Sequence, residues 1–217
     1  MASTSGTNLA KPRTMRRQLI IGAGIAALIA AMAFDTTVVH VGSTEDLRVQ
    51  GFDPDRFGQA EFPRIRALVL DRAVDAATLA EALETDRNAA IAEFGTMAGA
   101  FPVMPVFFTG TLGEGRSGIF PVTVEGLPDS VTLRVQTGPA INGTELRDIA
   151  GDISFGDFTN QIEYQNAGAG INRAMSADIL SNLDRDALEG ATVTVTGAFT
   201  MINPASWLIT PVTLEVQ

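Results

Sequence analysis

The sequence contains no cysteine, and it has a single histidine, one tryptophan and one tyrosine among its 217 residues. Without cysteine the chain can form neither a disulfide bond nor a thiolate metal site, and the cysteine count does not distinguish an oxidising from a reducing compartment. His40 has no histidine partner, so a histidine-based zinc site and a Ser-His-Asp triad both lack essential groups. We therefore predict no metal site and no cofactor.

Acidic residues are missing from the first 34 positions. Four of the 15 basic residues lie there, so the rest of the chain carries 25 acidic residues against 11 basic ones and a formal net charge of −14. Such a body repels nucleic-acid phosphates and anionic lipids. Aromatic residues interleaved for base stacking are also lacking, and the composition thus excludes a nucleic-acid partner.

Charge of either sign is absent from residues 19–34, which follow Arg16 and Arg17. A basic segment before an apolar run is the layout of an export signal. Ala31-Met32-Ala33 matches the small-residue cleavage pattern, which predicts either release by cleavage before Phe34 or retention in the inner membrane. A buried core helix is the third interpretation of this run.

The position of the arginines also predicts the topology, because the basic side of such a segment stays in the cytoplasm. Residues 1–17 are expected to form a polar, disordered cytoplasmic tail over most of their length. Residues 18–34 form the signal or anchor segment, although an apolar run this short needs its flanks to reach the roughly 20 residues of a full span. Everything from residue 35 onward is expected in the periplasm.

Residues 35–100 are predicted to be a helical N-terminal part. Apolar residues at helical spacing occupy Phe62 to Phe94, and Pro63 suits the first turn of a helix. Asp75 and Asp86 are suitable N-caps for two further helices, and Gly95 ends the second of them. This part is expected to pack its apolar face on a sheet.

From about residue 101 the apolar period changes to two, which is typical of half-buried strands. Three strands, one helix and two more strands form the order of a five-stranded OB-like barrel. We therefore predict an α+β protein whose residues 101–217 form an OB-like small antiparallel β-barrel with one inserted helix; an open antiparallel sheet with helices on one face is the alternative. The predicted strands and helix are 105–112, 119–125, 131–136, an additional strand 153–158, the helix 166–183, and the strands 192–199 and 208–216.

Residues 136–164 form the densest mixture of turn residues, short apolar runs and polar side chains in the chain. Gly138-Pro139 and Asn142-Gly143 are turn dipeptides. Buried Arg, Asp, Asn and Gln groups usually satisfy each other, which favours an internally bonded junction over a binding surface. Both interpretations stay open.

Within this stretch, G-P-A-I-N-G-T-E-L-R-D followed by I-S-F-G-D-F-T-N-Q-I-E-Y resembles a bacterial family of predicted periplasmic lipoproteins of unknown function. The resemblance extends over roughly residues 35–217 and ends in the I-T-P-V segment at 209–212. Genes of that family often lie beside sugar ABC-transporter genes, which implies transporter components as partners. Its members carry a lipidated cysteine, which this chain lacks.

These observations favour a non-enzymatic extracytoplasmic accessory or binding protein for a small polar ligand. Amide groups and a planar guanidinium can bind sugar hydroxyls or a carboxylate. Trp207 could stack on a sugar ring, although a core position is favoured. The candidate ligand-binding residues are Asn142, Thr144, Arg147, Asp148, Asn160, Gln161 and Glu163.

The alternative is a periplasmic hydrolase that uses a pair of carboxylates. Glycosidase chemistry needs two carboxyl groups facing each other across the scissile bond. Four acids of the central stretch could supply such a pair: Asp148, Asp152, Asp157 and Glu163.

Overall fold

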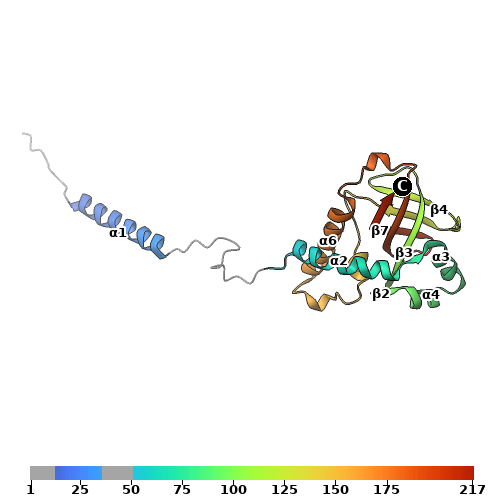
Figure 1. Ribbon diagram of the computed structural model, residues 1–217. Coiled ribbons are helices and arrows are strands. Elements are labelled where there is room, and N and C mark those ends of the chain that lie inside the picture. The colour runs from blue at the N-terminus through green and yellow to red at the C-terminus, as the bar shows by residue number, and fades with distance from the viewer. Residues whose placement is uncertain (1–12, 36–50) are drawn as a thin grey trace, which may run out of the picture. The chain divides into compact units, whose positions relative to one another are not determined.

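The computed structural model describes residues 13–35 and 51–217, which belong to two compact units, residues 1–51 and 52–217. In the first unit, helix α1 (Arg13–Asp35) contains the apolar run (Figure 1). No helix within the described residues is both long and apolar enough to cross a membrane. Residues 1–12 of the expected tail, and His40, lie outside the described residues.

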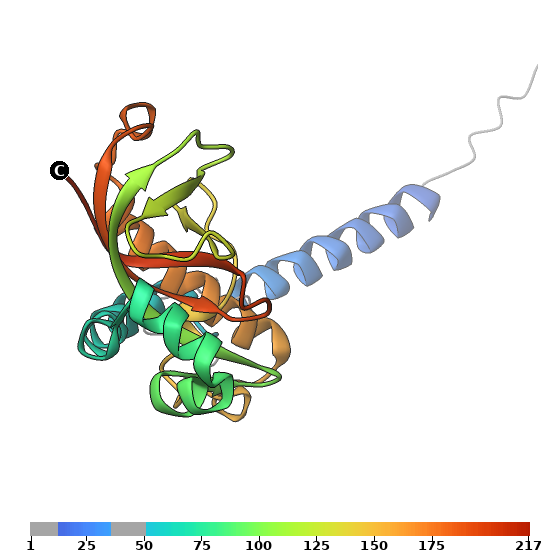
Figure 2. The ribbon, with the colours of Figure 1, turned by 90° about the vertical axis from the view of Figure 1, so that its right-hand side faces the viewer.

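The second unit is built on a closed five-stranded barrel in which the strands follow the order β3–β4–β5–β7–β6 and β6 pairs back onto β3 (Figures 1 and 2). This closure confirms the OB-like α+β fold and excludes the open sheet. One pair, β5 with β7, is parallel, and the others are antiparallel. The strands are β3 (Phe101–Leu112), β4 (Ile119–Val124), β5 (Thr132–Gln136), β6 (Thr192–Thr200) and β7 (Ser206–Val216).

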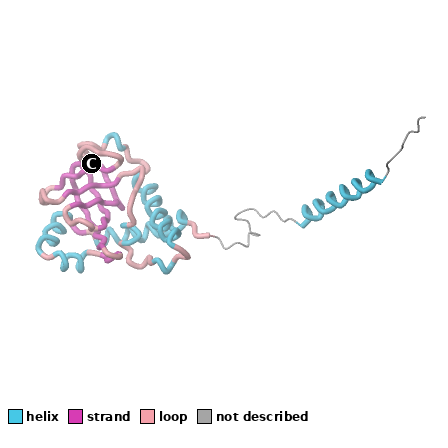
Figure 3. Tube along the Cα trace, turned by 180° about the vertical axis from the view of Figure 1, so that it is seen from behind, coloured by secondary structure: helices cyan, strands magenta, loops and turns pink. Residues whose placement is uncertain are grey.

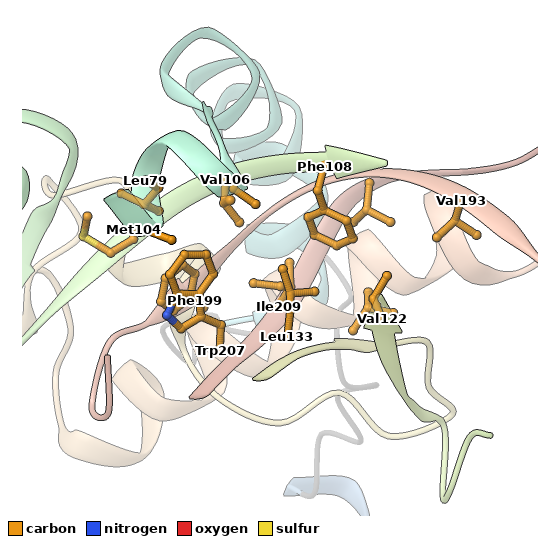
Figure 4. Packing of buried hydrophobic residues seen from close by; sticks show 14 of the residues in the cluster. Leu79, Met104, Val106, Phe108, Val122, Leu133, Val193, Phe199, Trp207 and Ile209 are labelled. Carbon is orange, nitrogen blue, oxygen red and sulfur yellow. The ribbon is translucent and has the colours of Figure 1, made fainter. Parts of the chain in front are cut away.

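The barrel interior is an apolar core supplied by alternate residues of each strand. Figure 4 shows Phe108, Leu133 and Ile209 converging in it. Trp207 is fully buried there, with its ring stacked on Phe199 at 4.8 Å between centroids, and its Nε1 donates to the Pro204 carbonyl at 2.8 Å. Trp207 is therefore a core residue, and its polar atom has a partner.

Two helices, α3 (Ala76–Thr85) and α4 (Arg87–Phe94), add apolar side chains to this core. Asp75 and Asp86 cap their N-termini as expected, and Gly95 follows the end of α4. Short strands β1 (Val74–Asp75) and β2 (Thr96–Ala98) flank them and pair with β3.

The prediction of a helix start at Pro63 was wrong. Helix α2 (Pro54–Arg72) begins nine residues earlier and keeps Pro63 in its interior. The Asp53 side chain accepts hydrogen bonds from the amides of Asp55 and Arg56, and Pro54 occupies the first turn. A capping aspartate followed by proline is a stronger start signal than a proline alone.

A second core lies outside the barrel, where α2 packs against α6 (Gln161–Met175) and against β3 and β6. Figure 3 shows helices gathered against the strands. Val103, Ala198 and Val212 contribute the barrel's side of this core. The remaining buried members are Phe62, Ile65, Val69, Leu146, Ile149, Ile171, Met175 and Leu180.

Two expectations for the segment between β5 and β6 were wrong. Residues 153–158 form no strand, because the Ser154 amide donates to Asp157 Oδ2 at 2.8 Å and closes a 3-10 turn at Phe155–Asp157. The helix predicted at 166–183 starts at Gln161 instead, and it continues after Met175 as a π turn, Ser176–Leu180. The central stretch is thus a long loop that contains the short helix α5 (Glu145–Asp148) and leads into α6.

Candidate functional site

Arg147 is the centre of a bonded network in the central stretch. Its Nη2 lies 2.7 Å from Asp148 Oδ1, and its Nη1 donates to the Tyr164 carbonyl at 3.1 Å. The guanidinium carbon lies 3.7 Å from the centroid of the Tyr164 ring. Thr144 Oγ1 donates to Asp148 Oδ2 at 2.6 Å. The pair is nearly closed to solvent, with side-chain exposures of 8% for Arg147 and 15% for Asp148, so these groups satisfy one another.

The other candidate residues lie apart from this network. Asn160 caps α6 by accepting from the Glu163 amide at 3.0 Å, and Glu163 Oε2 accepts from the Thr159 amide at 2.9 Å. Gln161 is the exposed first residue of α6. Asn142 lies in a loop, where its backbone amide donates to Gln136 Oε1 at 3.0 Å. The structure thus divides the seven candidates into a buried network, a helix cap and a loop residue.

The four acids of the hydrolase alternative are each engaged by a structural donor. Asp148 belongs to the Arg147 network, and Asp157 closes the turn at Ser154. Asp152 accepts two hydrogen bonds from Arg64, at 2.9 and 3.1 Å, and Glu163 completes the α6 cap. Their positions follow from local capping and pairing, and nothing in their geometry favours hydrolysis.

Gln136, Thr210 and Glu145 form a second buried polar network next to the turn at Asn142. Gln136 Nε2 donates to Thr210 Oγ1 at 2.9 Å and to the Asn142 carbonyl at 3.0 Å. Thr210 Oγ1 donates in turn to Glu145 Oε2 at 3.3 Å. Burial raises the pKa of the Glu145 carboxyl above its ordinary value of 4.5. This network fixes the turn to strand β7.

Glu145→Gln is expected to make the protein more stable at pH 8 and to leave its stability unchanged below pH 4.5. A carboxyl whose pKa is raised on folding favours the folded state at low pH, and that contribution is lost as the pH rises through the raised pKa. Glutamine keeps the shape and cannot ionise. Melting temperatures of both proteins across this pH range test the prediction, and parallel curves would contradict it.

A surface pocket of about 590 Å³ lies between residues 139–141 and the face formed by α6 and the π turn. Asn172, which is only 5% exposed, contributes to its lining. Its Nδ2 donates to the Gly143 carbonyl at 2.9 Å, whereas its buried Oδ1 has no partner among the described residues. Unsatisfied buried acceptors are rare in native proteins, which makes this atom unusual.

Two arginines border the same pocket. Arg185 is half-buried and held in place, since its Nε donates to the Thr137 carbonyl at 2.8 Å and its Nη2 to the Leu180 carbonyl at 3.3 Å. Arg173 is exposed, and its Nε lies 2.6 Å from Asp55 Oδ1. None of the described residues that line this pocket is acidic, although the chain from residue 35 onward carries a net charge of −14.

Sequence reasoning did not single out this pocket. Asn172 and Ser176 fell within a predicted helix, where a polar residue beside the apolar stripe is usually solvated. The available signal was the pair of small residues Gly168 and Ala169: Gly168 faces Thr144 and Arg147, and Ala169 lines the pocket. The π turn, a feature often found at functional sites, had no recognisable sequence pattern.

Comparisons with known proteins agree with this fold. Residues 24–215 match the model of a family described as predicted periplasmic lipoprotein (DUF2291). A crystal structure of an OB-fold protein from Thermotoga maritima is similar, with a TM-score of 0.61 and 20% sequence identity, over 77% of this chain and 100% of that one. No protein of curated function matches the chain. At this identity the structural likeness extends to the fold alone.

Proposed function

The chain belongs to the family of predicted periplasmic lipoproteins, and from this premise we propose that it is a non-enzymatic extracytoplasmic accessory protein that binds a small polar ligand. The observation that carries the proposal is the pocket beside α6, whose lining combines the amide residue Asn172, two serines and two arginines. Its volume of about 590 Å³ falls within the range of small-molecule sites.

The chemistry of the pocket favours binding over catalysis. Its described polar groups are amide, hydroxyl and guanidinium groups, which recognise hydroxyls and carboxylates without acting as a general base at neutral pH. The residues of the central stretch support it indirectly. Gln136 holds the loop at Asn142, and the neighbouring Gly143 receives the Asn172 hydrogen bond.

We propose further that the protein assists a sugar ABC transporter. This part of the proposal rests on the resemblance to the family, because genes of that family often lie beside sugar ABC-transporter genes. A periplasmic ligand-binding accessory protein would meet the transported solute before it reaches the membrane components. The transporter components are then the expected partners.

The N-terminal segment supplies the route of export in this proposal. The chain has no cysteine to carry the lipid that the family name implies. Residues 18–34 would then attach the protein to the inner membrane, or be removed by cleavage before Phe34. The acidic body from residue 35 onward would lie in the periplasm in either case.

Native mass spectrometry of the protein, isolated without denaturant from membranes and from periplasmic extract, tests the ligand binding and the fate of the N-terminal segment. We expect a retained small molecule on the wild-type protein and on Ala92→Trp, an exposed control position on α4. Ala140→Trp, at an exposed position that lines the pocket, should lose it.

A wild-type protein without any retained molecule, or equal retention by Ala140→Trp, would contradict the binding function. The same spectra report the N-terminus. A full-length mass in the membrane fraction indicates anchoring, and a mass starting at Phe34 in the extract indicates cleavage. A full-length species that stays in the cytoplasm would contradict export.

A further inference from the structure

The geometry points to a ligand class for the pocket beside α6: we propose that it binds a small hydroxylated carboxylate. This inference rests on the proposed binding function and adds the charge and the hydrogen-bonding character of the ligand. Two features carry it: the two arginines, and the hydroxyl groups of Ser176 and Ser181 in the lining.

The charge of the pocket indicates an anion. Arg173 and Arg185 line it, and no acidic residue is found among its described lining. In a body of net charge −14 this is a local reversal of sign, which concentrates small anions and repels cations. Planar guanidinium groups match the geometry of a carboxylate.

Arg185 is the better placed of the two. Its hydrogen bonds to the Thr137 and Leu180 carbonyls use Nε and Nη2, so that the side chain is fixed before any ligand arrives. No bond from its Nη1 is seen within the described part of the chain, which leaves that nitrogen for a ligand. A guanidinium held in advance loses little conformational entropy on binding.

Acidic residues that do not line this pocket also lie near both arginines, and they partly offset the positive charge of the guanidinium groups. Asp55 contacts Arg173, and it lines a different pocket together with it. Asp186 and Glu189 line a neighbouring pocket, which shares residues 139–140 and Arg185 with the first. Because Arg173 is already paired with Asp55, whereas Arg185 forms no ion pair with any described residue, we assign the main carboxylate contact to Arg185.

The hydroxyl groups of the lining indicate that the ligand carries hydroxyls as well. Ser176 and Ser181 line the pocket, and each can donate to or accept from a ligand hydroxyl. Asn172 also belongs to the lining, but its unsatisfied Oδ1 is buried and its Nδ2 already donates to the Gly143 carbonyl.

The test compares three probes by isothermal titration calorimetry at low salt: D-gluconate, D-sorbitol and hexanoate. Gluconate has both the acid and the hydroxyls, sorbitol has the hydroxyls alone, and hexanoate has the acid alone. We expect gluconate to bind at least tenfold more tightly than either of the others. Arg185→Gln should weaken gluconate binding at least tenfold and leave sorbitol unchanged.

Arg173→Gln, at an exposed position, should weaken gluconate binding by a smaller factor and serves if Arg185→Gln fails to fold. Arg56→Gln, an exposed arginine of α2 that does not line the pocket, is the matched control and should bind gluconate like the wild type. Equal binding of sorbitol would overturn the carboxylate requirement, and equal binding of hexanoate would overturn the hydroxyl requirement.

Failure of all three probes at tens of millimolar would overturn this ligand class. The proposed function would still stand if the isolated protein retained another molecule in a manner sensitive to Ala140→Trp. Retention that is insensitive to that substitution would instead contradict the proposed function itself. The two failures are therefore distinguishable.

Discussion

Arg147→Ala is expected to lower the free energy of unfolding by about 3–5 kcal/mol, the usual effect of removing one partner of a buried ion pair. Arg147 and Asp148 have side-chain exposures of only 8% and 15%. The substitution leaves the Asp148 carboxylate with the Thr144 hydroxyl as its one side-chain partner among the described residues, and it removes the cation from the Tyr164 ring. A loss of this size is a large fraction of the stability of an ordinary domain.

Urea denaturation of the second unit measures this effect, with Arg64→Ala as the matched control. Arg64 pairs with Asp152 at 2.9 Å, but the two side chains are 46% and 63% exposed, so the expected change is at most about 1 kcal/mol. Arg147→Ala/Asp148→Ala should recover part of the loss, because it removes the unpaired charge. Near-wild-type stability of Arg147→Ala would show that the pair is not a structural junction.

Gly170→Ala is expected to destabilise the protein by about 3 kcal/mol or more, at the upper end of overpacking effects. A methyl group at Gly170 would overlap the backbone carbonyl of Pro54, at the start of α2. Gly58 lies opposite, and its added methyl group would meet the backbone of Gly170. Backbone atoms cannot rotate away as side chains can, so the two helices would have to separate. This strain exceeds the roughly 1 kcal/mol that alanine gains over glycine inside a helix.

Gly168→Ala, two residues earlier on the same helix, is the control for the Gly170 prediction. Its methyl group would meet the Thr144 Cγ2 at 3.3 Å, and that side chain can adjust. We expect a change within about 1 kcal/mol of the wild type, in either direction. Thermal denaturation of both variants measures the difference. Equal melting temperatures for the two would indicate that α2 and α6 do not cross at Gly58 and Gly170.

Local patterns in the sequence were sufficient to predict the barrel. Alternation with a period of two marks a strand whose one face is buried, and it identified the segments of all five barrel strands and their order around α6. Capping is also local. Asp75 and Asp86 could be recognised as N-caps because each side chain bonds to amides only two or three residues ahead.

Local patterns failed where long-range contacts compete with them. Residues 153–158 have the apolar content of a strand, yet Phe158 packs against Phe52 at 5.2 Å and against Phe57 at 5.6 Å. Both rings come from the start of the second unit, more than a hundred positions earlier in the chain. A strand there would have to give up this cluster and the turn closed by Asp157.

The sequence by itself determined the acidic charge of the body, the apolar N-terminal run, the succession of barrel strands and helix along the chain, and two helix caps, because each depends on residues that are close neighbours in the chain. Only the tertiary structure decided the second core outside the barrel, the burial of the Arg147 pair and the pocket beside α6. That pocket unites residues 139–141, Asn172 and Arg185, which belong to three separate segments. Periodicity shows which face of an element is apolar, but the partner that covers this face is set by the packing of the whole chain.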